Sequence, residues 1–202
     1  MTALRNYLEQ MVRVRRTFMP EPPSNFNYWC IEDYTLDRGD EFTSAPLTED
    51  ETAFLLTVID RCSIGRFQQK QCFYNSQMLV LADHSRTLEY VEGYASGNAV
   101  IPVHHGWVVL NNKVVDLTFR TEKPNHKGRL RDRIFGTFPS KWAYIGTRMD
   151  RDMCRERIFR TQMVGTVLDD WESGYPLLQQ DRIAPCSVEP LDMAKVEQNC
   201  KV

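Results

Sequence analysis

Apolar and polar residues repeat with two different periods along the chain, and the change of period separates helical from strand-rich segments. Residues 1–18 carry apolar side chains at helical spacing with arginines between them, which predicts an amphipathic helix. A second helix is expected after Thr48, because Glu51 completes the Thr-x-x-Glu pattern of a helix N-terminus. Residues 72–82 are more uniformly apolar and predict a more buried helix.

The period then shortens to two. Residues 87–95 alternate in polarity, and residues 99–110 and 113–119 are rich in β-branched side chains, so a run of antiparallel strands is expected. Asn111 and Asn112 separate the last two strands. Asparagine tolerates positive φ, so this pair predicts a two-residue hairpin turn. Helices followed by strands indicate the α+β class, with helices packed on an antiparallel sheet.

Length and composition fit a single compact domain covering residues 1–202, of which 42% are hydrophobic. The prolines after residue 19 disfavour regular structure there. The aromatic side chains nearby would be exposed to solvent unless this stretch packs against the core. These patterns predict four segments: an N-terminal helix and wrapping arm (1–46), a core (47–120), a loop with short helices (121–178), and a polar, loosely attached tail (179–202). Within the third segment, the basic loop is expected at 120–141 and the short helices near 150–160 and 163–172.

Charge and hydropathy narrow the range of partners. The 25 basic and 27 acidic residues give a net charge of -2, so neither nucleic acid nor an anionic membrane surface is indicated. No apolar run approaches the roughly 18 residues that a membrane span requires. The N-terminus lacks the basic start and apolar core of a secretory signal, so a cytoplasmic location is expected.

The cysteines and histidines give no metal signature. Their spacing contains no Cys-x-x-Cys pair and no zinc-like cluster, so reduced thiols are expected, with no metal ion and no cofactor. The residues concerned are Cys30, Cys62, Cys72, Cys154, Cys186 and Cys200, and His84, His104, His105 and His126.

The hairpin register brings a histidine and a carboxylate together. If Leu110 pairs with Lys113 across the turn, Trp107 lies opposite Asp116. His105 then shares a face with both residues, because side chains two apart point the same way. Asp116 lies diagonally across from His105, within reach of its ring. The register therefore predicts that Asp116 orients His105.

Two alternatives depend on strand geometry. His104 points to the opposite face, because neighbouring strand residues alternate, and a one-residue slip of the register would exchange the two histidines. Glu92 lies on a neighbouring strand. It is either a solvated residue or a second carboxylate near His105, and the sequence leaves both readings open.

Cys72 supplies a candidate nucleophile because it begins the predicted helix 72–82. The positive end of the helix dipole favours a thiolate there, and an imidazolium nearby would favour it further. Amides at the same helix end are suited to stabilise an oxyanion. Taken alone, a cysteine before an apolar run is more often a small core residue. The order of Cys72, His105 and Asp116 along the chain favours the catalytic interpretation.

These residues also resemble a known family. Cys72, His105-Gly106-Trp107-Val108-Val109 and Val115-Asp116-Leu117-Thr118 are similar to the transglutaminase-like thiol enzymes, whose core carries Cys, His-Ala-Trp-Val and Asp-Pro-Thr in that order. The resemblance covers roughly residues 65–120. Gly106 and Leu117 replace the usual alanine and proline, and the Gly-Trp that often precedes the aspartate strand is absent. Arylamine N-acetyltransferases share the order, and Tyr90–Ala95 resembles small bacterial or phage proteins with this triad.

The resemblance implies a papain/transglutaminase-like core with Cys72 as nucleophile, His105 as general base and acid, and Asp116 as orienter. The implied activity is a thiol-dependent hydrolase, such as a protease or amidase, or an acyltransferase. Its substrate would be a peptide, amide, ester or thioester that forms an acyl-Cys72 intermediate. Water and an amine both remain open as acyl acceptor. A non-catalytic binding module that keeps the fold is the alternative.

Four further residues are candidates for substrate or oxyanion contacts. Gln71 and Asn75 lie near the nucleophile, where each is also suited to a local capping role. Trp107 would pack beside the site, and a core aromatic is an equally good interpretation. Glu92 completes the group as the possible second carboxylate.

Overall fold

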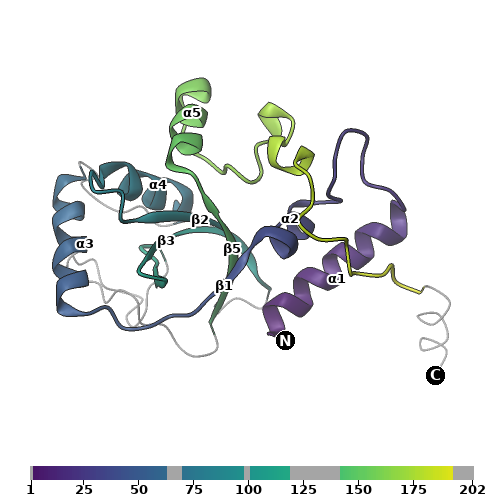
Figure 1. Cartoon of the computed structure of the whole chain (residues 1–202), viewed down its shortest axis with the longest axis horizontal. Coiled ribbons are helices and arrows are strands. Elements are labelled where there is room, and N and C mark those ends of the chain that lie inside the picture. Colours follow the sequence, from purple (N-terminus) through teal and green to yellow (C-terminus); the bar gives the residue numbers. More distant parts are fainter. Residues whose placement is uncertain (1, 63–69, 98–100, 119–141, 193–202) are drawn as a thin grey trace. The chain divides into compact units, whose positions relative to one another are not determined.

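The chain has a mixed α+β structure that divides into two compact units (Figure 1). The larger unit is Asp40–Val167, and the smaller combines Met1–Gly39 with Leu168–Val202. Among the helices described, none is both long enough and apolar enough to cross a bilayer. The computed structural model describes residues 2–62, 70–97, 101–118 and 142–192.

A five-stranded antiparallel sheet, curled into a half-barrel, forms the centre of the larger unit. The strand order is β1-β5-β2-β3-β4. Thr43 forms an isolated parallel bridge with Lys113, which joins the two edges of the sheet. The strands are β1 (Asp40–Phe42), β2 (Glu89–Ser96), β3 (Val103–Leu110), β4 (Lys113–Val115) and β5 (Ala143–Met149).

One face of this sheet carries a core centred on a tryptophan. Trp107 is fully buried and meets the rings of Phe42 and Tyr144 edge-on, with ring centroids 5.8 and 5.2 Å away. A Cβ at Gly146 would lie 2.5 Å from the Trp107 ring, so this glycine leaves room for the indole. The cluster comprises Phe42, Val91, Ala95, Trp107, Val109, Val114, Trp142 and Tyr144.

Helix α4 (Cys72–Ala82) packs on the other face of the sheet, as expected for the more buried helix. Ser76 donates its hydroxyl to the carbonyl of Gly106 at 3.0 Å. A Cβ at Gly106 would lie 2.9 Å from the Phe73 ring, so glycine permits this close approach. Helices α3 (Glu49–Arg61) and α5 (Arg151–Thr161) both contact α4, and α5 directly follows β5 (Figure 1). The predicted Thr48–Glu51 capping box is confirmed.

The predicted hairpin and its register are confirmed. Asn111 and Asn112 have φ angles of 51° and 62°, and Leu110 pairs with Lys113. Glu51 fixes the tip, because its carboxylate accepts from Lys113 Nζ at 2.7 Å and Asn111 Nδ2 at 2.9 Å. Strand β4 ends at Val115, earlier than expected, which leaves Asp116 beyond the ladder.

Several expected boundaries are wrong. The stretch 19–46, predicted to be irregular, contains α2 (Ile31–Arg38) and β1. Strand β5 was not predicted, although it lies between β1 and β2. The expected helix at 163–172 is absent from these described residues, apart from the start of a 3₁₀ turn at Trp171–Ser173. The basic loop at 120–141 lies outside the described residues.

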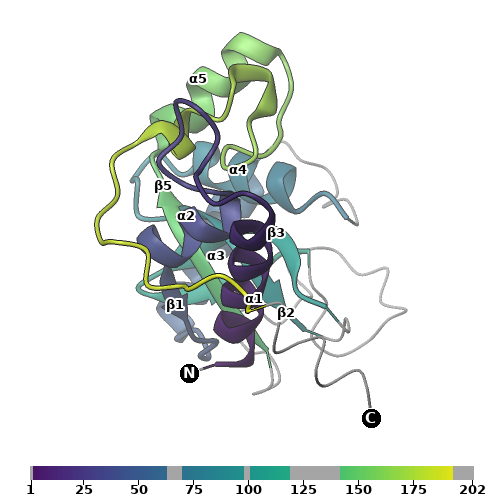
Figure 2. The same cartoon turned by 90° about the vertical axis from the view of Figure 1, so that its right-hand side faces the viewer.

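The smaller unit pairs two N-terminal helices with segments from the other half of the chain. The predicted amphipathic helix is confirmed as α1 (Ala3–Phe18), drawn in purple in Figure 2, and it packs against α2. Leu4, Leu8 and Val12 form its buried stripe. A short 3₁₀ helix, Pro176–Gln179, contacts α2.

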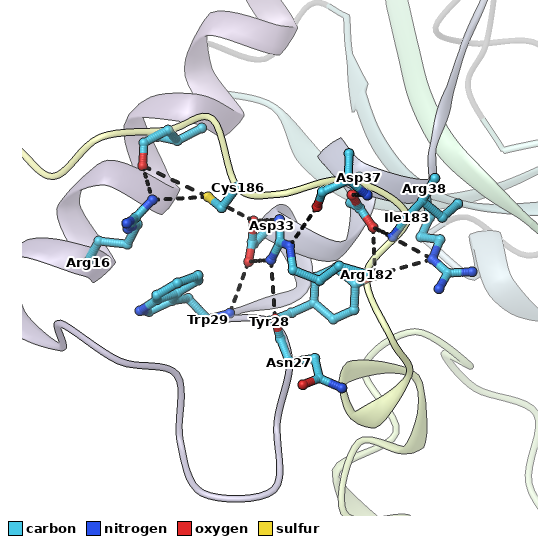
Figure 3. Close-up of polar contacts among 12 residues, drawn as sticks. Arg16, Asn27, Tyr28, Trp29, Asp33, Asp37, Arg38, Arg182, Ile183 and Cys186 are labelled. Atoms are coloured by element: carbon cyan, nitrogen blue, oxygen red, sulfur yellow. Dashed lines mark hydrogen bonds and ion pairs between the residues drawn. The ribbon is translucent and has the colours of Figure 1, made fainter.

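Residues 181–191, here called the C-terminal strap, are held by buried acidic side chains (Figure 3). Arg182 donates to both carboxylate oxygens of Asp33, at 2.7 and 3.0 Å, and its guanidinium lies over the Tyr28 ring. Asp37 accepts from the next two backbone amides, at 2.9 and 3.0 Å. The prediction of a loose tail is therefore wrong for this segment, whose polar groups bind protein carboxylates.

Candidate active site

Cys72 is the first residue of α4 and lies at the positive end of an 11-residue helix. Its side chain is mostly buried, with 8% of the residue exposed. The helix is held in place by Ser76 and by Gln77, whose amide donates to the Tyr90 hydroxyl at 3.2 Å. The local fold therefore fixes the sulfur at a helix end where backbone amides lack intrahelical partners.

His105 connects this thiol to a carboxylate. Its Nε2 lies 2.6 Å from Asp116 Oδ2, and the ring also forms a hydrogen bond with Cys72. Burial alone would lower the pKa of His105, but the charge and hydrogen bond of Asp116, followed by those of Cys72, raise it to about 10. The imidazole is therefore protonated at neutral pH beside the thiol, the arrangement that favours a thiolate–imidazolium pair.

Asp116 is fixed by two further donors. The hydroxyl of Tyr144 donates to Oδ2 at 3.1 Å, and the backbone amide of Thr118 donates to Oδ1 at 2.9 Å. Burial, together with the negative charge of Asp116, raises the pKa of Tyr144 well above its usual value, so this hydroxyl keeps its proton. The carboxylate is thus held in one orientation by two donors.

Tyr144 was missed by the sequence analysis. It lies on β5, which is three strands away from β4 in the sheet order. Curling of the sheet into a half-barrel allows its hydroxyl to reach Asp116 across the interior. The only local sign was a tyrosine in a short apolar run, which does not specify a partner.

Two of the additional candidate residues, Trp107 and Asn75, are buried, and a third, Gln71, is exposed. Trp107 stacks beside His105, with centroids 6.2 Å apart and an interplanar angle of 18°. It is fully buried and has no surface for substrate, so the core interpretation holds. Asn75 is also buried and donates to Thr118 Oγ1 at 2.9 Å, which supports the Asp116 turn. Gln71 is exposed at the N-cap and makes no capping bond, so the predicted cap is wrong.

Glu92 does not approach the triad, so its proposed role as a second carboxylate near His105 is wrong. It pairs in the ladder with Gly106, and its Oε1 lies 3.1 Å from Nε2 of His104. Glu92 is fully buried, which also excludes the solvated alternative. The sheet therefore carries two imidazole–carboxylate pairs on opposite faces, and the predicted pairing of His105 with Asp116 is the one that includes the thiol.

The other thiols have different surroundings. Burial raises the pKa of Cys154 to about 12, and it also raises the pKa of Cys30. Across the described parts of the chain, no group of three or more His, Cys, Asp or Glu side chains is arranged to hold a metal ion. The five cysteines in those parts are all free.

The comparisons with known proteins add no identification. No family model, curated protein or solved structure matches the chain.

Proposed function

We propose that the protein is a thiol-dependent hydrolase or acyltransferase that acts on an amide, ester or thioester through an acyl-Cys72 intermediate. The observation that carries this proposal is the contact of one buried imidazole, His105, with both the Cys72 thiol and the Asp116 carboxylate. The order of these residues on a helix, a strand and the end of the next strand also fits a papain/transglutaminase-like core.

The geometry supports a two-step reaction. The Cys72 thiolate attacks the acyl carbon, and the carbonyl oxygen becomes an oxyanion that amides at the N-terminus of α4 are suited to stabilise. The bond to the leaving group then breaks, and the protonated His105 gives that group its proton. An acceptor with an O–H or N–H bond then attacks the acyl carbon, and its proton passes to the neutral His105. The C–S bond breaks, and its electron pair returns Cys72 to the thiolate form.

Asp116 does not touch the substrate in this scheme. Its charge and its hydrogen bond with Nε2 leave Nδ1 as the ring nitrogen that can serve the thiol. Tyr144 and Thr118 hold the carboxylate in that orientation. Asp116 is therefore a positioning residue for the imidazole, and Tyr144 and Thr118 in turn position Asp116.

Alkylation tests the nucleophile directly. Iodoacetamide at neutral pH should label Cys72 well before Cys154, because the pKa of Cys154 is raised to about 12. Peptide mapping of the labelled protein over time measures both rates. Equal labelling rates at the two positions would remove the support for an activated thiol.

Acylation tests the reaction. p-Nitrophenyl acetate should give a burst of p-nitrophenol equal to one acyl group per chain, and the Cys72→Ala variant should fold but give no burst. Cys154→Ala is the matched control, since it removes a second buried thiol and should retain the burst. If the wild type and Cys72→Ala behave alike, the non-catalytic binding module becomes the better description.

A further inference from the structure

The turn that carries Asp116 lies just beyond the paired part of the sheet. Strand β4 ends at Val115, which is also its last residue paired with β3. The next three residues, 116–118, are here called the acid turn. Side chains hold it in place, because Leu117 is fully buried and the Tyr144 hydroxyl donates to Asp116 at 3.1 Å. The position of the acid turn thus depends on contacts with neighbouring elements.

Asn75 supplies such a contact from helix α4. It is fully buried, and its Nδ2 donates to Thr118 Oγ1 at 2.9 Å. The backbone amide of Thr118 in turn donates to Asp116 Oδ1 at 2.9 Å. Burial shields the Asn75 bond from competition with water, which strengthens it. Asn75 therefore ties α4 to the acid turn.

The same end of α4 carries the nucleophile. Asn75 follows Cys72 by three positions, and residues three apart lie beside each other on one face of a helix. The Asn75 backbone amide donates to the Gln71 carbonyl at 2.9 Å, so Asn75 belongs to the first hydrogen-bonded turn of the helix. One helical turn thus joins the thiol to the side chain that binds the acid turn.

These contacts close a ring around the triad. Cys72 forms a hydrogen bond with His105, and His105 Nε2 lies 2.6 Å from Asp116 Oδ2. Thr118 then connects Asp116 with Asn75, and one turn of α4 leads back to Cys72. In a closed ring, no member can shift without straining another bond. Loss of the Asn75 bond would leave His105 paired with Asp116 but would remove a tie between the acid turn and the helix that carries the thiol.

We propose that Asn75 is a positioning residue, which holds Cys72 in line with His105 for attack on the acyl carbon. This inference rests on the proposed function. Packing alone does not account for the amide, because a leucine of nearly the same size would fill the site without needing a hydrogen-bond partner. A misplacement of about 1 Å can cost about 10²-fold in rate, so a small shift of the helix against the acid turn would be felt in catalysis.

Single substitutions on the two sides of the bond test this role. Asn75→Leu keeps the side-chain volume, and its burst with p-nitrophenyl acetate should slow by about 10- to 100-fold. Thr118→Val removes the acceptor hydroxyl but keeps the backbone amide that serves Asp116, and it should be about as slow. Thr118→Ser retains the hydroxyl and should be clearly faster than Thr118→Val. In Asn75→Leu, the far-downfield proton NMR signal of the His105–Asp116 hydrogen bond, identified by its absence from Asp116→Asn, should persist.

The double variant Asn75→Leu/Thr118→Val separates alignment from stability. Replacing both partners by apolar groups of similar shape leaves neither of them unpaired, so its thermal unfolding should be close to that of wild type. Its burst should stay as slow as in either single variant, because the same bond is lost in all three. Recovery of the burst rate together with stability would show a purely structural role and would overturn the proposal.

Ser85→Ala is the matched control at the other end of α4. It removes a bond of 2.5 Å from Ser85 Oγ to Asp83 and should leave the burst rate within about twofold of wild type. A burst in Ser85→Ala as slow as in Asn75→Leu would assign the effect to the whole helix and overturn the proposal. Wild-type burst rates in Asn75→Leu and Thr118→Val would overturn the role of Asn75 alone, whereas absence of a burst in wild type would overturn the proposed function as well.

Discussion

Strand β3 presents two neighbouring histidines to two different surroundings. His105 and His104 each contact a fully buried carboxylate side chain through Nε2, Asp116 in the first case and Glu92 in the second. The His105 side chain is 3% exposed and meets a thiol, whereas the His104 side chain is 20% exposed and lies between aromatic rings. A carboxylate partner alone therefore does not distinguish the two histidines, whereas the hydrogen bond of His105 with the Cys72 thiol does.

The two carboxylates are also held by similar means. A tyrosine hydroxyl donates to each of them, from Tyr144 to Asp116 and from Tyr90 to Glu92. Tyr90 comes from the same strand as Glu92, while Tyr144 comes from β5 across the half-barrel. This symmetry makes matched substitutions on the two faces informative.

The largest difference in acylation rate is expected between the variants that remove the charge of Asp116 and of Glu92. Asp116→Asn should slow acylation by about 10²- to 10³-fold, because the amide cannot stabilise the imidazolium. This loss is smaller than the ~10⁴-fold loss known for serine triads, since a thiol site begins from an ion pair. Glu92→Gln should leave the burst rate within about tenfold if thermal unfolding shows it to be folded. A larger acylation loss in Glu92→Gln than in Asp116→Asn would mean that Glu92, and not Asp116, supports the histidine that serves the thiol.

The tyrosines should give a smaller contrast in the same direction. Tyr144→Phe removes one donor from Asp116 and should slow acylation by about fivefold, the effect of roughly 1 kcal/mol. Tyr90→Phe removes the equivalent donor from Glu92 and should leave acylation nearly unchanged. Burst rates for both variants measure the difference, and equal losses would mean that the hydroxyls act only through general stability.

The pH dependence of stability should distinguish the thiol-bearing face. The folded-state pKa of His105, about 10, exceeds the ordinary histidine value near 6.5. Its stabilisation is therefore complete below about pH 6.5 and is lost as the pH rises toward 10. Urea unfolding at pH 6, 8 and 10 should show this decline in wild type and a much weaker one in Asp116→Asn. The same decline in both proteins would contradict the assignment.

The smallest effect on the reaction is expected from Glu51 at the hairpin tip, because the tip supports the His104 and His105 faces of β3 equally. Lys113, Asn111 and the Thr48 amide lower the pKa of Glu51 to about 2. Its contribution is therefore present above about pH 4.3 and is lost as the pH falls toward 2. Glu51→Gln should cost about 1 kcal/mol at pH 7 and change both reaction steps by less than about threefold. A larger loss in either step would show that the tip also positions the triad.

The sequence was sufficient where structure is local. The Asn111-Asn112 turn determined the register that separates His105 from His104, and Thr48 with Glu51 marked a helix start. The apolar run after Cys72 predicted α4 with its first residue. Each of these predictions depended on residues a few positions apart, where the physical rules are strongest.

Features that depend on distant pairing were not predictable in the same way. The face occupied by Glu92 follows from its pairing with Gly106, a register that no short turn within the described residues specifies. β5 has little alternation, and its Tyr144 reaches Asp116 only because the sheet curls. Gly106 looked like a minor departure from the pattern of the thiol enzymes that the sequence resembles, yet a Cβ there would lie 2.9 Å from the Phe73 ring and would force that ring to shift.

The C-terminal strap also imposes an order on folding. Arg182 lies 149 residues after its partner Asp33, so α2 leaves the ribosome long before the segment that neutralises this carboxylate. The sheet unit, Asp40–Val167, is complete by then. Domains generally fold as units during synthesis, and closing so long a loop is entropically costly. The smaller unit therefore cannot be completed before residue 182 is made, and translation arrested before that point would leave Asp33 without its Arg182 partner.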